Sequence, residues 1–466
     1  MGQLRGRAVL FVLGMTFAPA AVAQRGRTPK ATELDPQIVA AVKDISAARV
    51  KATIEKLVSF HNRSTLSAAD AVSISKGRGI GAAREWVRSE FEHYSKDCGG
   101  CLKVEMQSFT VNPPARRIPH ATEIVNVIAT LEGSDPDNAG RIYVVSGHYD
   151  SRNSDNDNVT DPAPGANDDA SGTAVALECA RVLSKHKFPA TLVFMAFAGE
   201  EQGLYGSAHY AEAAKAAKLD IEAVLNNDIV GGNRTPGDRM QQPQWVRVFS
   251  EGIPAATTPD QIKLIRATGM EEDSPSRQLA RYVREIAQQY VPGFEPKLVS
   301  RPDRYLRGGD HLSFNEQGFA AVRLSEYRED YNHQHQTPRI EKGVEYGDLA
   351  KFVDFAYVAN DARLNAATLA SLASAPAPPA SVRLVTRSLE NDSTLTWSAS
   401  PGSLAAKYEV LWRPTTDTEW PPQNVEAVGN VTQARLNRSK DNVVFAVRAV
   451  DAKGHRSLAV VPLPQP

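Results

Sequence analysis

The stretch Thr191-Leu192-Val193-Phe194-Met195-Ala196-Phe197-Ala198-Gly199-Glu200-Glu201 decides the fold class. Its apolar run, Ala190 to Ala198, has the length of a strand buried on both faces, and a helical pattern follows from Tyr205 to Ala217. The same alternation occurs upstream, with a strand over Arg141–Ser146 and a helix over Ser171–Lys187. Strands alternating with helices predict an α/β fold with a mainly parallel, doubly wound sheet flanked by helices.

Further apolar and helical patterns extend this first domain in both directions. Asp35 and Ser274 each precede a proline, which is typical of a capped helix start. The additional predicted strands are 223–227 and 320–325. The additional predicted helices are 36–61, 81–94, 275–290 and 347–364. The main domain is therefore expected to cover residues 24–365.

Composition changes after this domain. Residues 366–381 carry no charge and become rich in alanine, proline and serine, which is typical of an interdomain linker. Short alternating strands follow within 382–466, at 382–386, 393–398, 407–413 and 443–450. They predict a small β-sandwich, and its tryptophan, tyrosine and phenylalanine positions resemble those of a fibronectin type III domain.

The N-terminus has the pattern of an export signal. Arg5 and Arg7 precede an apolar run, and Ala21-Val22-Ala23 forms a small-residue cleavage site. The run falls short of the ~20 residues of a membrane span. We therefore expect a signal peptide at 1–23 and a periplasmic or secreted protein.

The cysteines agree with that compartment, and the net charge bears on possible partners. Cys98 and Cys101 are close enough in sequence for a local disulfide, and Cys179 lies in an apolar helical stretch that predicts burial. With 53 basic and 54 acidic residues, the chain has no field that would attract nucleic acid. Neither a nucleic-acid partner nor a membrane span is expected.

Side chains that bind metals follow the predicted strands. In an open α/β sheet, ligands bind at the carboxyl ends of the strands. The residues found there, or at the start of the helix after the first strand, are His148, Asp150, Asp168, Asp169, Glu200, Glu201, Asp228, His333 and His335. A pair of glutamates after so apolar a strand is costly to bury unless a cation is bound.

The residue types indicate zinc. Histidine nitrogens and carboxylate oxygens without thiolates suit a hydrolytic zinc site that keeps a position open for water. Five protein ligands exceed what one catalytic zinc uses, whereas two ions that share a bridging carboxylate account for them. We therefore expect two zinc ions per chain.

Four motifs carry a family resemblance over roughly residues 54–364. They are Ser146-Gly147-His148-Tyr149-Asp150-Ser151, Gly165-Ala166-Asn167-Asp168-Asp169-Ala170-Ser171-Gly172, Gly199-Glu200-Glu201-Gln202-Gly203-Leu204-Tyr205-Gly206-Ser207 and Asn227-Asp228-Ile229-Val230-Gly231. The chain resembles the di-zinc aminopeptidase family that includes bacterial leucyl aminopeptidases, with glutamate carboxypeptidase and glutaminyl cyclase as more distant relatives. The resemblance implies the zinc exopeptidase type of α/β fold.

The resemblance also implies roles for these residues. Asp168 would bridge the two zinc ions, and His148 and Asp228 would bind the first. Glu201 and His335 would bind the second, although His333 could take the place of His335. Asp150 would orient His148, and Glu200 would be the general base for attack by a metal-bound hydroxide.

The expected function is therefore that of an exported zinc exopeptidase acting on peptides, most simply an aminopeptidase. A carboxypeptidase needs arginines for the substrate carboxylate, and four arginines flank predicted pocket segments: Arg301, Arg304, Arg307 and Arg328. A glutaminyl cyclase and a noncatalytic receptor or adhesin could also be built on this scaffold.

Gly308–Phe314 is expected to line the pocket or to form a loop held by Asp310 and His311.

Overall fold

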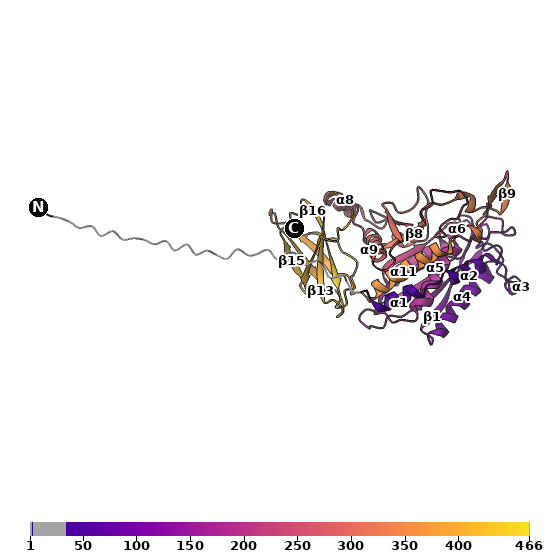
Figure 1. Cartoon of the computed structure of the whole chain (residues 1–466), viewed down its shortest axis with the longest axis horizontal. Helices are drawn as coiled ribbons and strands as arrows, with labels where there is room; N and C mark the ends of the chain where they lie inside the picture. The colour runs from indigo at the N-terminus through magenta and orange to yellow at the C-terminus, as the bar shows by residue number, and fades with distance from the viewer. Residues whose placement is uncertain (1, 3–33, 466) are drawn as a thin grey trace. The chain divides into compact units, whose positions relative to one another are not determined.

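An eight-stranded sheet lies at the centre of the first part of the chain (Figure 1). Its strand order is β1-β2-β4-β3-β5-β8-β6-β7. The strands are β1 Leu102–Val111, β2 Thr122–Leu131, β3 Arg141–His148, β4 Thr191–Phe197, β5 Asp220–Asn227, β6 Trp245–Ser250, β7 Glu295–Val299 and β8 Ala321–Glu326. Strands β4, β3, β5 and β8 run parallel, and antiparallel pairs occur on either side of them. The predicted mainly parallel α/β sheet is confirmed.

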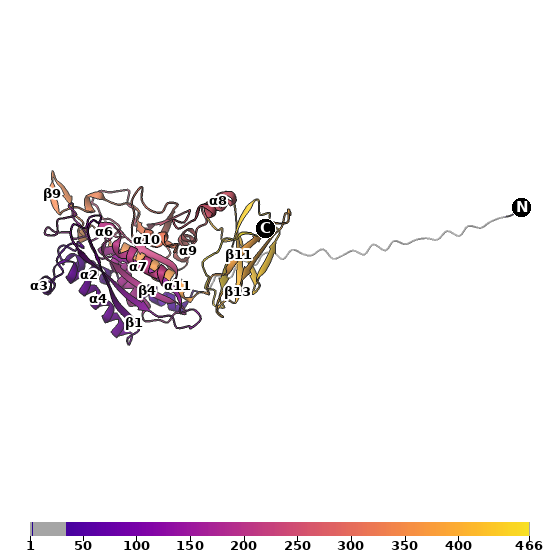
Figure 2. The same cartoon turned by 180° about the vertical axis from the view of Figure 1, so that it is seen from behind.

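Helices cover both faces of this sheet. One face packs against α5 Ala170–Leu183 and α11 Phe355–Ser374, which in turn contact α1 Pro36–Asp44, α2 Ala47–Val58 and α9 Pro275–Tyr290. The opposite face, seen in Figure 2, packs against α7 Tyr205–Ala216 and α10 His311–Glu316. The remaining helices are α3 Ala71–Ser75, α4 Gly79–Asp97, α6 Glu200–Gly203 and α8 Pro259–Thr268. The sheet is therefore doubly wound, as predicted.

The computed structural model describes residue 2 and residues 34–465. The predicted signal peptide, 1–23, thus lies outside the described residues apart from Gly2. Within the described residues, no helix is long and apolar enough to cross a membrane. Cys98 and Cys101 form the predicted disulfide, and Cys179 is buried.

Two helix predictions were wrong in their boundaries. The single helix predicted over 36–61 is two helices, because Ser46 has an extended backbone and caps α2 by accepting a hydrogen bond from the Arg49 amide. Helix α11 starts after its cap, Asp354, and ends at Ser374, so it covers the first part of the predicted linker, 366–381. That segment lacks charge because it is buried, and its alanines favour helix.

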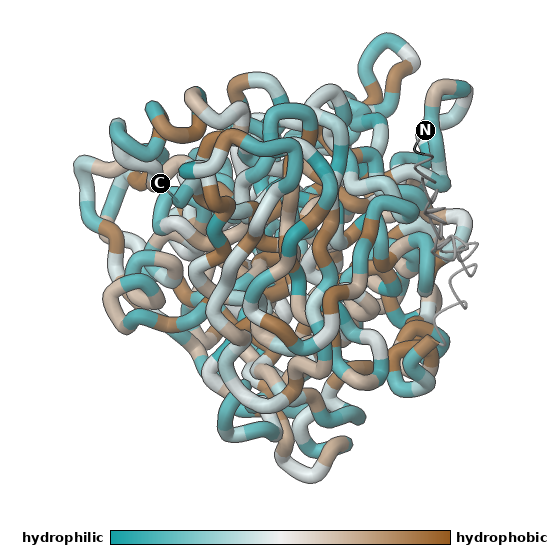
Figure 3. The backbone as a smooth tube through the Cα atoms, turned by 90° about the vertical axis from the view of Figure 1, so that its left-hand side faces the viewer, coloured by the Kyte–Doolittle hydropathy of each residue, from teal (hydrophilic) through white to brown (hydrophobic). Residues whose placement is uncertain are grey.

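The C-terminal part forms two small sheets. Strands β11 Ala380–Val385, β12 Ser393–Ser398, β15 Gln433–Leu436 and β17 Leu463–Gln465 form one sheet, and β13 Lys407–Pro414, β14 Val425–Gly429 and β16 Val443–Val450 form the other. Trp397 and Tyr408 pack in their shared core with ring centroids 5.5 Å apart. In Figure 3 the hydrophilic residues, in teal, predominate in the peripheral loops. The fibronectin type III resemblance remains a prediction.

Candidate metal centre

The candidate ligands converge at the carboxyl ends of adjacent strands. His148 is the last residue of β3, and Asp228 directly follows β5. Glu200 and Glu201 follow β4 at the start of the short helix α6, and Asp168 lies just before α5. The parallel order of β4, β3 and β5 therefore brings side chains from distant parts of the sequence to one edge.

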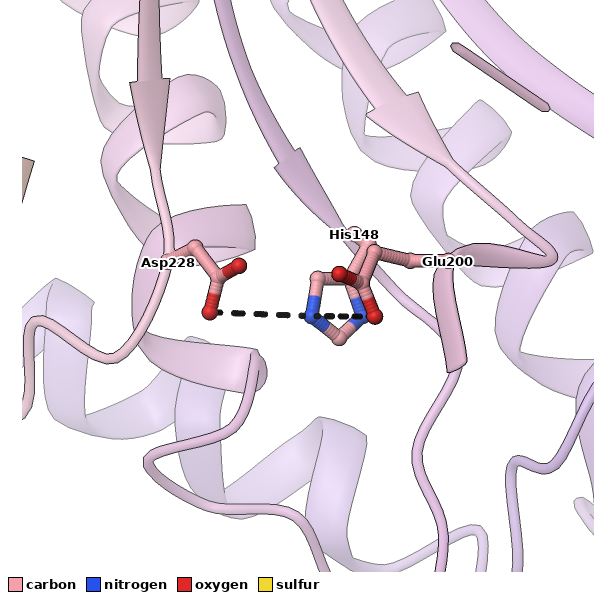
Figure 4. A group of neighbouring side chains, drawn as sticks. All are labelled: His148, Glu200 and Asp228. Atoms are coloured by element: carbon pink, nitrogen blue, oxygen red, sulfur yellow. Dashed lines mark ion pairs between the residues drawn. The ribbon is translucent and has the colours of Figure 1, made fainter. Parts of the chain in front are cut away.

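These residues form two groups of three. His148, Glu200 and Asp228 form the first group, and Figure 4 shows the imidazole between the two carboxylates. Asp168, Glu201 and His335 form the second group. In each group the candidate ligand atoms lie within 4.8 Å of one another, a separation that a single ion can span.

The Asp168 carboxylate faces both groups. Its Oδ1 lies 3.2 Å from His148 Nε2, and its Oδ2 lies 2.8 Å from His335 Nε2. His335 Nε2 is also 3.0 Å from Glu201 Oε1. One carboxylate oxygen is thus directed to each group, which is the geometry of a bridging ligand.

The chemistry of this centre fits zinc. His148 Nε2 and Glu201 Oε1 are buried, and the close approaches to Asp168 and His335 give neither atom a well-aligned hydrogen bond among the described residues. Burial raises the pKa of Glu200 well above its ordinary value and raises that of Glu201 as well. A divalent cation would satisfy the orphaned atoms and favour the ionised carboxylates, and nitrogen and oxygen ligands without thiolate suit zinc in a hydrolytic site.

Asp150 supports His148 from behind. It is fully buried, and its Oδ1 lies 3.2 Å from His148 Nδ1. Its Oδ2 accepts hydrogen bonds from Thr65 Oγ1 at 2.9 Å and from the Glu201 amide at 3.3 Å. Asp150 therefore holds the imidazole with Nε2 directed towards the other ligands.

Two carboxylates to which the sequence analysis gave no role fix the backbone of the candidate ligands. Asp169 Oδ2 accepts a hydrogen bond from the His148 amide at 2.9 Å. Asp348 accepts one from the Asn167 amide and one from the Asp168 amide, each at 2.7 Å, through its two different oxygens. Asp169 could have been found from its place in the motif, but no local pattern marks Asp348.

Comparison with known proteins identifies the family. The sequence profile of peptidase family M28 matches residues 126–354. A probable zinc metalloprotease of Leptosphaeria maculans is 44% identical over 92% of this chain and 97% of its own length. One of Pyrenophora teres f. teres is 45% identical over 92% of this chain and 87% of its own length.

The chain belongs to peptidase family M28. It is a zinc metallopeptidase, and a peptidase implies peptide substrates. Among solved structures, the LapA aminopeptidase of Legionella pneumophila superposes with a TM-score of 0.51 at 21% identity, covering 75% of this chain and 78% of its own. That likeness shows the fold of the M28 domain.

The two histidines near the C-terminal end of the M28 domain have different surroundings. His335 belongs to the second group of candidate ligands. His333 instead stacks on Phe352, with ring centroids 3.6 Å apart, and its Nδ1 faces Thr235 and Asp330. His333 is therefore held by structural contacts and does not face the centre.

Arg63 connects two of the M28 motifs. It is fully buried, and its guanidinium donates to the backbone oxygens of Tyr149 at 2.9 Å, Pro164 at 2.6 Å and Gly165 at 2.9 Å. Burial lowers its pKa to about 10. The arginine thus ties the segment after His148 to the loop that leads to Asp168.

A pocket of about 330 Å³ opens over both groups of the M28 centre. Asp168, Glu200, Glu201, Asp228 and His335 contribute to its lining, and so do five arginines: Arg116, Arg117, Arg152, Arg304 and Arg307. Arg304 and Arg307 were expected near the pocket from the sequence, whereas Arg116, Arg117 and Arg152 were missed.

The segment Gly308–Phe314 has a divided role. Gly308 lines the pocket. Asp310 and His311 are fully buried beside it, and burial raises the pKa of Asp310 to about 7. His311 Nε2 lies 2.8 Å from the Pro302 backbone oxygen. Gly308 thus lines the pocket as expected, whereas the alternative expectation of a loop held by Asp310 and His311 was wrong, because His311–Phe314 belong to α10.

Proposed function

We propose that this M28 metallopeptidase is an exported aminopeptidase that uses two zinc ions. The observation that supports two ions is the Asp168 carboxylate, whose two oxygens face different groups of ligands. In this proposal His148 and Asp228 would hold the first ion, Glu201 and His335 would hold the second, and Asp168 would contribute one oxygen to each. When bound, the ions would acidify a water molecule and polarise the scissile carbonyl.

Glu200 is assigned the role of general base because of its exposure. Its side chain is 14% exposed, whereas those of Asp168, Glu201 and Asp228 are 3–5% exposed. Among the four carboxylates that line the pocket, Glu200 is therefore the most accessible to water and substrate. From this position Glu200 can take a proton from the attacking water and deliver it to the leaving amine.

The same carboxylate supports action at the N-terminus of a peptide. An aminopeptidase has to hold the free ammonium group of its substrate, and a carboxylate that borders the pocket forms a charge-assisted hydrogen bond with it. Glu200 lines the pocket together with the second group of ligands. It can therefore contact both the water that attacks and the amine that binds.

Export is part of the proposal. The signal pattern at 1–23 and the Cys98–Cys101 disulfide both support an oxidising compartment outside the cytosol. Expression of the full chain in a bacterial host, followed by N-terminal sequencing of the product, tests this part. Cleavage near Gln24 with activity in the periplasm or medium is expected, and an uncut protein in the cytosol would contradict it.

The catalytic part is tested by metal content and hydrolysis. We expect two zinc ions per mature chain, and hydrolysis of aminoacyl-nitroanilides that disappears on chelation and returns with zinc. Glu200→Gln should keep the zinc and lose activity by about 10²–10⁴-fold, as expected for loss of a general base. Glu212→Gln, an exposed glutamate of α7, is the matched control and should retain full activity.

Three results would contradict the proposal in different ways. One zinc ion with cyclisation of N-terminal glutamine would indicate a glutaminyl cyclase. Two zinc ions with release of only C-terminal residues would indicate a carboxypeptidase. A protein that binds no zinc and cleaves no peptide would indicate a noncatalytic receptor or adhesin.

A further inference from the structure

Within the part of the chain that the structure describes, three of the pocket arginines have no acidic partner. Arg304 and Arg307 are paired with Glu329, at 3.1 and 3.3 Å. By contrast, Arg116, Arg117 and Arg152 have no carboxylate oxygen within 4.0 Å of a guanidinium nitrogen anywhere in residues 34–465. Surface arginines are usually paired or solvated, so three unpaired ones bordering one pocket need an explanation.

These three arginines, called here the arginine triad, line the same pocket. Arg117 Nη1 donates a hydrogen bond to the Glu201 backbone oxygen at 2.7 Å, which fixes its position beside the metal ligands. Burial, together with the positive charges of Arg152 and Arg116, lowers the pKa of Arg117. The Arg117 guanidinium therefore lies near enough to Arg116 and to Arg152 to be repelled by both.

The acids of the pocket do not account for the triad. Four carboxylates line the floor, those of Asp168, Glu200, Glu201 and Asp228. If two zinc ions are bound there, as the proposed function states, their four positive charges balance those four negative ones. Those carboxylates would then not be free to balance the triad, and a carboxylate of the substrate would relieve the repulsion among its positive charges.

We propose that Arg116, Arg117 and Arg152 form a carboxylate-binding subsite, so that this peptidase prefers peptides carrying a carboxylate beside the scissile bond. Guanidinium groups bind carboxylates through paired, charge-assisted hydrogen bonds, which suits a partly buried wall. The carboxylate is either the side chain of an aspartate or glutamate, or the free terminus of a dipeptide. The inference rests on the proposed function, since it names the substrate class of that same site.

Three pairs of substrates distinguish the sources. Glu-Ala-amide against Gln-Ala-amide tests an acidic first residue, Ala-Glu-amide against Ala-Gln-amide tests an acidic second residue, and Ala-Ala against Ala-Ala-amide tests the free terminus. We expect kcat/KM to favour the acid by at least tenfold in one pair, the size of a charge-assisted hydrogen bond. That pair identifies where the carboxylate lies.

Two variants test the triad itself. Arg116→Gln and Arg152→Gln should each lower the acid-to-amide ratio by about tenfold, with kcat/KM for the neutral amides changed less than threefold. Arg266→Gln, an exposed arginine of α8, is the control and should leave the ratio unchanged. Arg117 is left intact because its bond to the Glu201 backbone oxygen also supports the metal ligands.

Binding separates a failure of the subsite from a failure of the proposed function. Calorimetry on zinc-loaded Glu200→Gln protein should show the favoured acid binding about tenfold more tightly than its amide, whether or not the wild-type protein is an aminopeptidase. Equal binding and equal kcat/KM in all three pairs would overturn the subsite. Variants that reduce acid and amide turnover equally would also overturn it, because the arginines would then act only on the metal ligands.

Discussion

Asp348→Asn should weaken zinc binding although Asp348 is not a ligand. Each oxygen of this carboxylate accepts one backbone hydrogen bond, from the Asn167 and Asp168 amides, both at 2.7 Å. The side chain is buried, and Asn offers one oxygen and one NH₂ group. One of the two backbone N–H groups would then face a donor and stay unsatisfied.

The structure sets the size of the effect. An unsatisfied buried donor costs about 1–3 kcal/mol. Because Asp168 faces both groups of ligands, any tilt of its backbone moves one oxygen away from each group. We therefore expect zinc affinity to fall about 10–100-fold, as for other residues that support ligands, with both ions affected.

The assay is zinc competition with a chelator, alongside urea unfolding of the metal-free protein. Asp354→Asn is the matched control, because this substitution also removes one negative charge. The Asp354 side chain also accepts two backbone hydrogen bonds, at 3.0 and 3.2 Å, but it does so at the start of α11. Both of those bonds end on one oxygen, which Asn retains, so zinc affinity should stay unchanged. Zinc affinity within twofold of wild type in Asp348→Asn would refute the reasoning.

Two further predictions concern stability. Gly172→Ala should destabilise the fold by about 3 kcal/mol or more, since the added Cβ would lie 2.0 Å from the Asn227 backbone oxygen. In the control Gly140→Ala, the added Cβ meets no described atom within 4 Å, so the free energy of unfolding in urea should stay unchanged. Burial raises the pKa of Asp361 from 3.8 to about 8, so the folded protein keeps this proton at pH values where the unfolded chain loses it. The stability contributed by the protonated form is therefore fully present below pH 3.8 and is lost as pH rises towards 8. Asp361→Asn should therefore raise Tm more at pH 8 than at pH 5, and an equal change at both values would contradict the assigned pKa.

The sequence alone was enough to predict the central strands and to place the candidate metal-binding side chains after them. Apolar runs such as 191–197 are local patterns, and so is the placement of His148, Glu201 and Asp228 at or after strand ends. Because parallel strands end at one edge of a sheet, a correct fold class was sufficient to predict that these residues meet. The outer strands β1, β2, β6 and β7 were not predicted. Strands β1, β6 and β7 lack comparably continuous apolar runs, whereas β2 has an apolar run over 124–131 that only Asn126 and Thr130 interrupt, and it was missed.

Only the tertiary structure decided how the side chains are directed. His333 and His335 have nearly the same sequence context, but packing against Phe352 turns one away while the other meets Asp168 and Glu201. The contact of Asp348 with the Asp168 amide spans 180 residues of sequence. The arginine triad likewise depends on loops that the sheet brings over the same pocket. Such contacts depend on the packing of distant segments, and short-range periodicity carries no information about them.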